Sequence, residues 1–288
     1  MAYTFDGAKA PDRRRTQYFE MLLNRAIYHD GWMASSRAAI PWEGGARSID
    51  PDTLKWELYN VEKDFSQADD LAAQMPEKLV EMQQLWWAEA ARYQVLPLDG
   101  RATERLNAEM MGRPSPTAGR TKFSYHPGTV ALPSGSAPNI LNKSFRVTAA
   151  VEIPKGSADG AVWVMGGGDG GYAIYIRDRK PVFAGNYLGR AITRVASQQP
   201  LPEGKVSLRA EFAYDGGGMG KGGTMSLFVN DAKAAEARMA ATQGITLGLG
   251  GTLDVGEDTG SPVDDVYTPP FRFHGKVHSV TVELISPD

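Results

Sequence analysis

The densest group of metal-ligand side chains in the sequence lies in a stretch of turn-forming residues. Residues 254–265, DVGEDTGSPVDD, carry the carboxylates of Asp254, Glu257, Asp258, Asp264 and Asp265. Carboxylate oxygens gathered in one loop are ligands that calcium prefers. Their spacing differs from that of an EF-hand loop, and a solvated acidic turn is the simpler interpretation. We name Asp254, Glu257 and Asp258 as calcium candidates beside that interpretation.

Other chemistry is limited by the reactive side chains that the sequence contains. Cysteine is absent, which excludes disulfides, zinc–thiolate sites and thiol nucleophiles. The four histidines are His29, His126, His274 and His278. They form no H-E-x-x-H pattern, and no G-x-S-x-G elbow accompanies them. His29 has the most suggestive neighbours, Asp30 and Trp32, although a sheet-edge histidine without chemistry is the simpler interpretation.

Two glycine-rich stretches imitate phosphate-binding loops. Gly166-x-Gly168-x-x-Gly171 matches a dinucleotide fingerprint, but the residues that follow, YAIYIRD, predict a strand where pyrophosphate binding needs a helix. The stretch DGGGMGKGG (215–223) lacks the first glycine and the final Ser or Thr of a Walker loop. Both are therefore interpreted as connections between strands.

Charge and hydropathy exclude further classes of partner. The formal net charge is −3, so no strong field favours nucleic acid or an anionic membrane. The basic run Arg13-Arg14-Arg15 is interpreted as a solvated surface feature. No apolar run approaches the roughly 18 residues of a membrane helix. The first residues, MAYTFD, lack the pattern of a signal peptide, and both periplasm and cytoplasm fit the sequence.

Residues 1–96 predict a small α+β unit. Residues 17–34, QYFEMLLNRAIYHDGWMA, predict two apolar strands that meet around Asn24-Arg25, the second closing on Asp30-Gly31-Trp32. Residues 55–61 predict a strand, and residues 62–74 a short helix. A second helix is expected from Pro76, where a missing N–H costs nothing. Its apolar stripe is Leu79, Met82, Leu85, Trp86, Ala90 and Tyr93. The apolar hairpin needs a covering element, which the sequence alone does not identify.

The rest of the chain has a different pattern. Residues 97–120 are linker-like, with one short helix expected near their middle. Residues 121–288 alternate with a period of two between Gly, Pro and Asp turns, which predicts an all-β sandwich. Hairpin turns are expected at Asp178-Arg179-Lys180 and at Asn230-Asp231. The fold class is thus α+β: a small antiparallel sheet plus a helix, followed by the sandwich.

The order of several motifs resembles the C-terminal part of bacterial arylsulfatases of the sulfatase family. The resemblance covers essentially all 288 residues. Its segments are TQYFEMLLNRAIYHDGWMA, KWELYNVEKDFSQADDLAAQMPEKLVEMQQLWWAEA, GGYAIYI, NYLG, FAYDGGGMGKGGTMSLFVN and DVGEDTGSPV. The sequence departs from the family at Leu23, where Gly is usual, and at Met33, where Lys is frequent.

The resemblance implies a sulfate-ester hydrolase whose large catalytic α/β domain lies upstream of the matched region. That domain would hold the formylglycine nucleophile of a C/S-x-P-x-R signature and the family's calcium. Here Ser136-Ala137-Pro138-Asn139 is followed by Ile140 in place of Arg, so no catalytic residue is carried over and the chain alone is expected to be inactive. The implied partners are the catalytic domain and a sulfated small molecule or glycan.

Two further hypotheses concern binding. In the complete enzyme, Tyr28, His29 and Trp32 are candidates for the wall of the substrate mouth. In the other hypothesis, the chain is a free-standing module whose concanavalin- or laminin-G-like sandwich binds a glycan. Its candidate aromatic residues on a concave face are Tyr172, Tyr175, Phe183 and Tyr187. Exposed apolar area on residues 1–96 would favour the sulfatase hypothesis.

Overall fold

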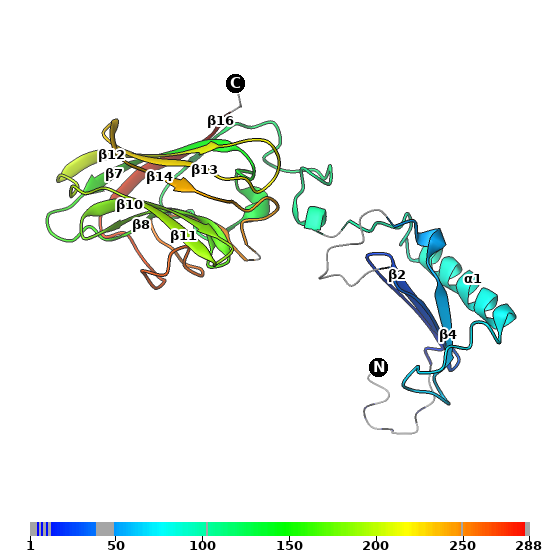
Figure 1. Cartoon of the computed structure of the whole chain (residues 1–288). Coiled ribbons are helices and arrows are strands. Elements are labelled where there is room, and N and C mark those ends of the chain that lie inside the picture. Colours follow the sequence, from blue (N-terminus) through cyan, green and yellow to red (C-terminus); the bar gives the residue numbers. More distant parts are fainter. Residues whose placement is uncertain are drawn as a thin grey trace. The chain divides into compact units, whose positions relative to one another are not determined.

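The computed structural model describes residues 5, 7, 10, 13–38, 49–101, 103–248 and 250–285. The chain forms two compact units, Met1–Arg105 and Leu106–Asp288 (Figure 1). Residues 40–53, whose turn-forming composition predicts a loop, lie mostly outside the described residues. In the described part of the chain, no helix is both long and apolar enough to cross a bilayer.

The smaller unit contains a four-stranded antiparallel sheet in chain order. Its strands are β1 (Thr16–Met21), β2 (Asn24–His29), β3 (Trp32–Ser36) and β4 (Trp56–Asn60). The three predicted strands are confirmed as β1, β2 and β4, whereas β3 was not predicted. The first turn lies at Leu22-Leu23, two residues before the expected position. Both leucines have left-handed φ angles, 52° and 70°. Leu23 is buried, so packing holds an apolar residue in a conformation that usually favours glycine.

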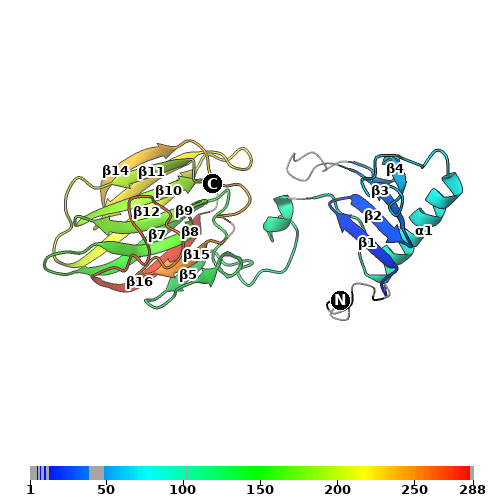
Figure 2. The same ribbon diagram turned by 90° about the horizontal axis from the view of Figure 1, so that it is seen from below.

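Helix α1 (Pro76–Arg92) covers one face of this sheet, as Figure 2 shows. Met82, Trp86 and Ala90 are fully buried against Ile27 and neighbouring sheet residues. The indole Nε1 of Trp86 also donates to the carbonyl of Phe19 at 3.0 Å. The predicted helix is confirmed, and five of the six residues of its predicted stripe pack on this core; the sixth, Tyr93, follows the helix and is half exposed. The hairpin therefore packs one of its faces on a helix of its own unit.

The short helix expected over 62–74 is wrong, because this segment is a series of turns. The carboxylate of Asp64 accepts the backbone N–H groups of Ala68 and Asp69 at 2.7 and 2.9 Å. Asp70 accepts those of Leu58 and Ala72 at 3.1 and 2.9 Å. Aspartate side chains that bind nearby N–H groups offer the backbone an alternative to helical hydrogen bonds.

The larger unit is a β-sandwich of two six-stranded sheets, which confirms that part of the predicted fold class. One sheet has the order β11-β10-β9-β8-β15-β6, and the other β14-β13-β12-β7-β16-β5. The first consists of β6 (Leu132–Pro133), β8 (Gly160–Gly167), β9 (Gly170–Arg177), β10 (Lys180–Tyr187), β11 (Ala191–Ala196) and β15 (Thr252–Val255). The second consists of β5 (Lys122–Tyr125), β7 (Ser144–Ile153), β12 (Gly204–Tyr214), β13 (Gly223–Val229), β14 (Ala232–Met239) and β16 (Lys276–Ile285). Three short 3-10 helices complete the chain's helical elements among the described residues: η4 (Pro51–Thr53), η5 (Thr103–Leu106) and η6 (Ser134–Ser136).

The predicted turns of the sandwich are confirmed. Asp178 and Arg179 join β9 to β10, and Asn230 and Asp231 join β13 to β14; all four have positive φ angles. Two successive positive φ angles are typical of the tight turn that matches strand twist. The Gly166–Gly171 motif forms the β8–β9 hairpin, and residues 215–223 connect β12 to β13.

The sandwich has two apolar clusters, one inside and one on an outer face. The large core lies between the sheets and includes Phe145, Trp163, Phe183 and Leu208. The second cluster covers the outer face of β8, β9 and β10, where Val263 and Tyr267 from the β15–β16 connection pack on sheet residues. That outer sheet face is therefore occupied by the chain itself.

Candidate functional site

The three calcium candidates already have partners within the protein. Asp254 lies in β15, is buried, and accepts the N–H and Oγ1–H of Thr259 at 2.9 and 2.8 Å. Asp258 accepts the hydroxyl of Tyr267 at 2.7 Å, and Glu257 pairs with Arg272 at 3.2 Å. No three His, Asp or Glu side chains in the described ranges form a group that could hold a metal ion. Calcium binding here remains a prediction for which this part of the chain offers no ligand set.

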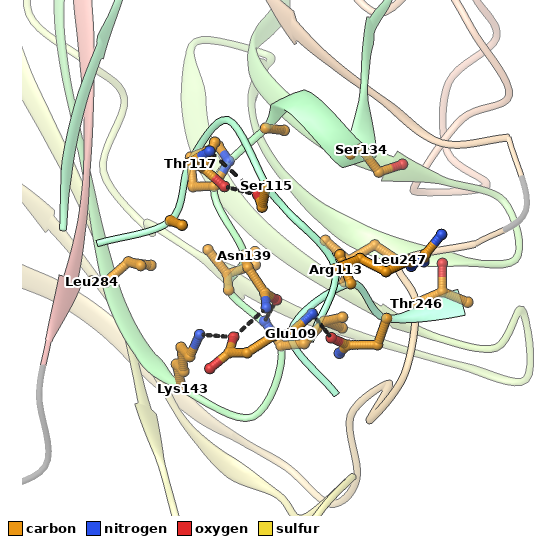
Figure 3. A pocket seen from close by; sticks show the side chains of 18 of the residues that line it. Glu109, Arg113, Ser115, Thr117, Ser134, Asn139, Lys143, Thr246, Leu247 and Leu284 are labelled. Atoms are coloured by element: carbon orange, nitrogen blue, oxygen red, sulfur yellow. Dashed lines mark hydrogen bonds and ion pairs between the residues drawn. The ribbon is translucent and has the colours of Figure 1, made fainter. Parts of the chain in front are cut away.

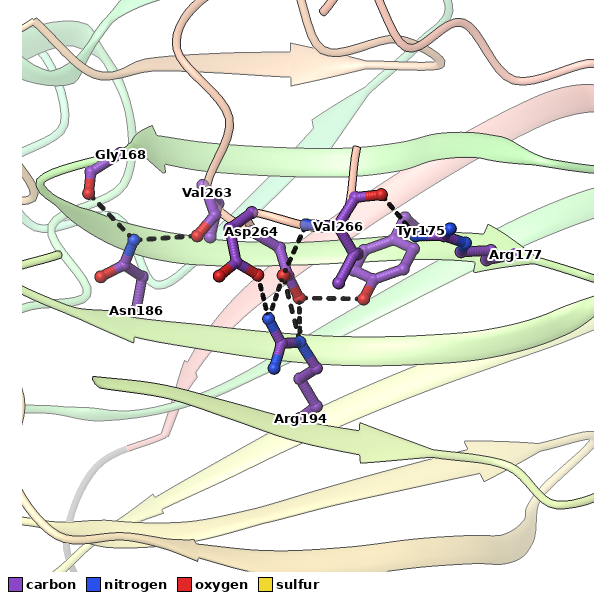
Figure 4. Close-up of polar contacts among 9 residues, drawn as sticks. Gly168, Tyr175, Arg177, Asn186, Arg194, Val263, Asp264 and Val266 are labelled. Carbon is purple, nitrogen blue, oxygen red and sulfur yellow. Dashed lines mark hydrogen bonds and ion pairs between the residues drawn. The ribbon is translucent and has the colours of Figure 1, made fainter. Parts of the chain in front are cut away.

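Asp264, from the same loop, is buried and not solvated. Figure 4 shows its contacts with Arg194 and Tyr175. Arg194 Nη2 and Nε donate to its two carboxylate oxygens at 2.6 and 2.8 Å, and the Tyr175 hydroxyl donates at 2.9 Å. Burial pushes the pKa of Asp264 upward, but the hydrogen bonds from Arg194 and Tyr175 outweigh burial and hold this pKa below its usual value. These hydrogen bonds hold the β15–β16 connection against strands β9 and β11 of the sheet.

The predicted aromatic binding face is wrong. Tyr172 and Phe183 point into the core between the sheets, where their ring centroids lie 6.1 Å apart. Tyr175 points to the opposite face but is buried beneath the β15–β16 connection. Tyr187 is half-buried against the main core. Three of the four rings are buried and the fourth is half-buried on the core, so together they do not form an exposed aromatic face for a glycan.

The three substrate-side candidates of the smaller unit lie on different faces of its sheet. His29 pairs with Trp32 across β2 and β3 on the face that α1 covers. His29 Nδ1 lies 2.8 Å from Thr16 Oγ1, and its Nε2 lies 3.5 Å from Asp30. Trp32 packs on the core, with Lys78 Nζ 5.7 Å from its ring. Tyr28 projects to the opposite face, so the structure does not bring the three side chains together.

A cavity of about 520 Å³ in the larger unit was not predicted. Its wall is formed by residues 106–120, 134–143 and 245–247, together with Met165 and Leu284 (Figure 3). The sequence predicts a linker over residues 97–120, but the boundary of the units lies at Arg105/Leu106, so segment 106–120 belongs to the larger unit. The wall therefore combines segments that are far apart in the sequence.

Hydrogen bonds hold the polar groups of this wall in place. Glu109 accepts Lys143 Nζ at 2.6 Å and Asn139 Nδ2 at 2.7 Å (Figure 3). Asn107 is buried, and its side chain accepts the backbone N–H groups of Glu109 and Met110 at 3.0 and 3.2 Å. This Asx-type turn fixes the direction of Glu109 and is the one local sequence signal that could have revealed the site.

The wall offers both charge and apolar surface. Its charged groups are Arg113, Arg120, Lys143 and Glu109, three cations and one carboxylate. Leu106, which is 53% exposed, contributes apolar surface. A planar carboxylate, an amide and an ammonium group side by side can exchange hydrogen bonds with hydroxyl groups, while the cations favour a ligand with negative charge.

Searches with protein-family models and against curated proteins found no match for this chain. Among solved structures, the chain is similar to the CBM40 of the IT-sialidase from Ruminococcus gnavus, at 15% identity over 58% of this chain and 92% of that chain, with a TM-score of 0.42. It is similar to domains LG4-5 of the mouse laminin alpha1 chain, at 11% identity over 57% of this chain, less than half (40%) of that chain, and a TM-score of 0.40. It is also similar to galectin LEC-6 from Caenorhabditis elegans, at 16% identity over 59% and 99% of the two chains, with a TM-score of 0.34. At these TM-scores we base no functional assignment on the likenesses.

Proposed function

We propose that the larger unit is a lectin-like sandwich that binds a glycan in the 106–143 cavity. The observation that carries this proposal is the group of Glu109, Asn139 and Lys143, which lies beside apolar residues in one cavity. Sugars present hydroxyl groups at their edges and C–H groups on their faces, and this wall offers a partner for each. The volume of the cavity, about 520 Å³, lies within the range of about 300–1,000 Å³ for small-molecule sites.

The charge of the wall narrows the ligand to an anionic sugar. Three cationic side chains face one carboxylate, and Glu109 is already engaged by Lys143. A sulfate or carboxylate group on the sugar could pair with Lys143 and Arg120, which line the same cavity. Aromatic stacking is not part of this proposal, because no aromatic residue is among those that line the described cavity.

A glycan array with the full chain, followed by calorimetry on the bound sugars, tests the proposal. Lys143→Met should weaken binding of a sulfated or carboxylated sugar at least about tenfold, because a hydrogen bond to a charged group contributes about 1.5–3 kcal/mol. The matched control is Lys233→Met, which also removes the lysine of a Glu–Lys pair but lies on β14. Absence of any bound glycan, or equal affinities of Lys143→Met and wild type, would refute the glycan site.

A second proposal concerns the smaller unit: it is the C-terminal part of an arylsulfatase-type hydrolase whose catalytic domain packs on the open face of the sheet. The supporting observation is that Phe19 and Met21, on the face opposite α1, are 49% and 57% exposed. Tyr28 and Met33 lie on the same face. Exposed apolar residues gathered on one sheet face are typical of an interaction surface.

Two measurements bear on this second proposal. The purified chain, incubated with calcium and an aryl sulfate, should show no turnover. Hydrolysis needs both a nucleophile and a charge-neutralising metal, and this proposal places both in the catalytic domain. Reading the DNA upstream of codon 1 should reveal an in-frame C/S-x-P-x-R motif. Turnover by the chain alone, or an upstream frame without that motif, would overturn the proposal.

A further inference from the structure

The glycine-rich loop between β12 and β13, residues 215–222, has a fixed shape. Four of its glycines have positive φ angles, which most other residues would not tolerate. The hydroxyl oxygen of Tyr214 accepts the backbone N–H of Lys221 at 3.0 Å, and the same hydroxyl donates to the carbonyl of Gly218. One tyrosine side chain therefore joins the two sides of the loop.

Two neighbouring segments hold this loop in place. Asn142 Oδ1 accepts the backbone N–H of Gly220 at 2.8 Å, and Asn142 Nδ2 donates to the carbonyl of Gly244 at 2.6 Å. The Oγ1–H of Thr242 donates to the carbonyl of Lys221 at 2.9 Å. The loop is thus bound to segments that lie far from it, and from each other, in the sequence.

Both of these segments continue directly into the wall of the 106–143 cavity. Lys143, which lines the cavity, is the residue after Asn142. Gly244 is followed by residues 245–247, which also line the cavity. Because successive Cα atoms are only about 3.8 Å apart, the loop and the cavity share a border along two separate segments.

The tip of the loop packs on this border and offers two kinds of contact to a ligand. A Cβ atom placed on Gly244 would lie 3.1 Å from Met219 Cβ, so the tip touches this segment directly. Met219 is 48% exposed, and Lys221 is also exposed. In the part of the chain that the structure describes, the ammonium group of Lys221 pairs with no carboxylate. An apolar side chain and a cation therefore lie beside the cavity.

The donors inside the cavity are already arranged around a carboxylate. Lys143 Nζ and Asn139 Nδ2 donate to the same oxygen, Oε2 of Glu109, at 2.6 and 2.7 Å (Figure 3). A lysine ammonium group has three N–H donors, so Lys143 can bind a second carboxylate without releasing Glu109. The cavity thus has a donor for the carboxylate of a sugar acid, and Lys221 provides another outside it.

We propose that the 106–143 cavity and the tip of the 215–222 loop form one extended site for an oligosaccharide of uronic acids. One sugar unit lies in the cavity, with its carboxylate on Lys143. The next unit lies on the loop, where Lys221 pairs with its carboxylate and Met219 contacts the C–H groups of its ring. This inference rests on the glycan site proposed above and adds the class of sugar and a second subsite.

Calorimetric titration of the full chain tests the inference. The probes are the monomers and trimers of galacturonic, glucuronic and mannuronic acid, and the methyl ester of each trimer. At least one trimer should bind about tenfold or more tighter than its monomer, because it makes a second charge-assisted contact. Three units that enter the cavity one at a time would give an advantage of only about threefold. The methyl ester, which has no charge, should bind at least about tenfold weaker than the free trimer.

Variants assign the trimer's advantage to the loop. Met219→Ser/Lys221→Met should lower this advantage to about threefold and leave the affinity for the monomer within about twofold of wild type. Lys205→Met, the matched control, removes an exposed lysine at the other end of β12 and should leave the advantage within about twofold. Lys143→Met should weaken the binding of monomer and trimer alike, because both occupy the cavity.

The outcomes separate this inference from the glycan site itself. The extended site is overturned if the trimer's advantage is only about threefold in wild type, or if the advantage survives in Met219→Ser/Lys221→Met. The sugar class is overturned if no uronic acid binds while another glycan binds in a way that requires Lys143. If Lys143→Met leaves every affinity unchanged, the glycan site fails, and the extended site fails with it.

Discussion

Replacing Arg194 by methionine should strongly destabilise the larger unit. Asp264, whose side chain is 0% exposed, would lose the one cation that contacts both of its oxygens. The Tyr175 hydroxyl and the backbone N–H of Val266 would remain as donors at 2.9 and 3.2 Å. Methionine keeps much of the aliphatic length of arginine, so the change tests the charge more than the packing.

The magnitude follows from the burial of the pair. Removal of one partner of a buried ion pair costs about 3–5 kcal/mol. Because 38% of the Arg194 side chain is exposed, solvent screens part of its charge, and we expect the low end, about 3 kcal/mol. In a unit of this size, that cost lowers the thermal midpoint by about 6–12 °C.

The stability of the larger unit should depend on pH in opposite directions in the wild type and in Arg194→Met. In the wild type, the pKa of Asp264 lies below its usual value of 3.8, so the pair stabilises the fold above that value and is lost as pH falls through the folded-state pKa. Without Arg194, burial dominates and raises this pKa, so stability should instead fall as pH rises through the raised value.

Differential scanning calorimetry of the full chain at several pH values measures both effects on the transition of the larger unit. Arg194→Met/Asp264→Asn provides the control, because a neutral amide at 264 no longer needs the cation; it should recover a large part of the loss. A cost below about 1 kcal/mol, or a variant whose stability follows pH as the wild type does, would show that this pair does not hold the β15–β16 connection.

Two further changes probe other buried groups. Burial, assisted by the charge of Asp254, raises the pKa of Asp258 above its usual 3.8 despite a hydrogen bond from Tyr267, so stability is lost as pH rises through the raised pKa. We therefore expect the thermal midpoint of Asp258→Asn, measured relative to that of the wild type, to be higher at pH 7 than at pH 4. An equal difference between variant and wild type at both pH values would contradict this. Trp86→Ala should cost the smaller unit about 3–5 kcal/mol, because the side chain is fully buried, and calorimetry should show the transition of the larger unit unchanged.

The regular elements were predictable because their patterns are local. The stripe of α1 repeats every three or four residues, and the sandwich strands alternate between core and surface. The turn at Leu22-Leu23 was not predictable from the sequence, because leucine is not a usual residue for left-handed φ angles. Only the burial of Leu23 accounts for the turn at this position. The false helix at 62–74 failed for another local reason: Asp64 and Asp70 bind backbone N–H groups that a helix would need.

The candidate sites were harder to predict because they depend on contacts between distant segments. Glu109 meets Lys143 across 34 residues, and segment 106–120 has the composition of a linker. Tyr175 and Asp264 are 89 residues apart, so an acidic stretch that suggested a solvated turn instead supplies a buried carboxylate. The pattern of residues within segment 106–120 or within the acidic stretch 254–265 does not reveal which distant residues each segment contacts.

The buried network also decides where a glycan can bind on the sandwich. To reach the rings beneath the β15–β16 connection, a ligand would first have to separate Asp264 from Arg194 and Tyr175. If that opening costs about 3 kcal/mol, the open state holds less than one molecule in a hundred, and the apparent affinity falls by the same factor of roughly one hundred. A millimolar sugar contact, equivalent to about −4 kcal/mol, would be almost cancelled by that cost. The 106–143 cavity needs no such opening, because Glu109, Asn139 and Lys143 are already joined around it. Preformed geometry therefore favours the cavity over the sheet face that the sequence suggested.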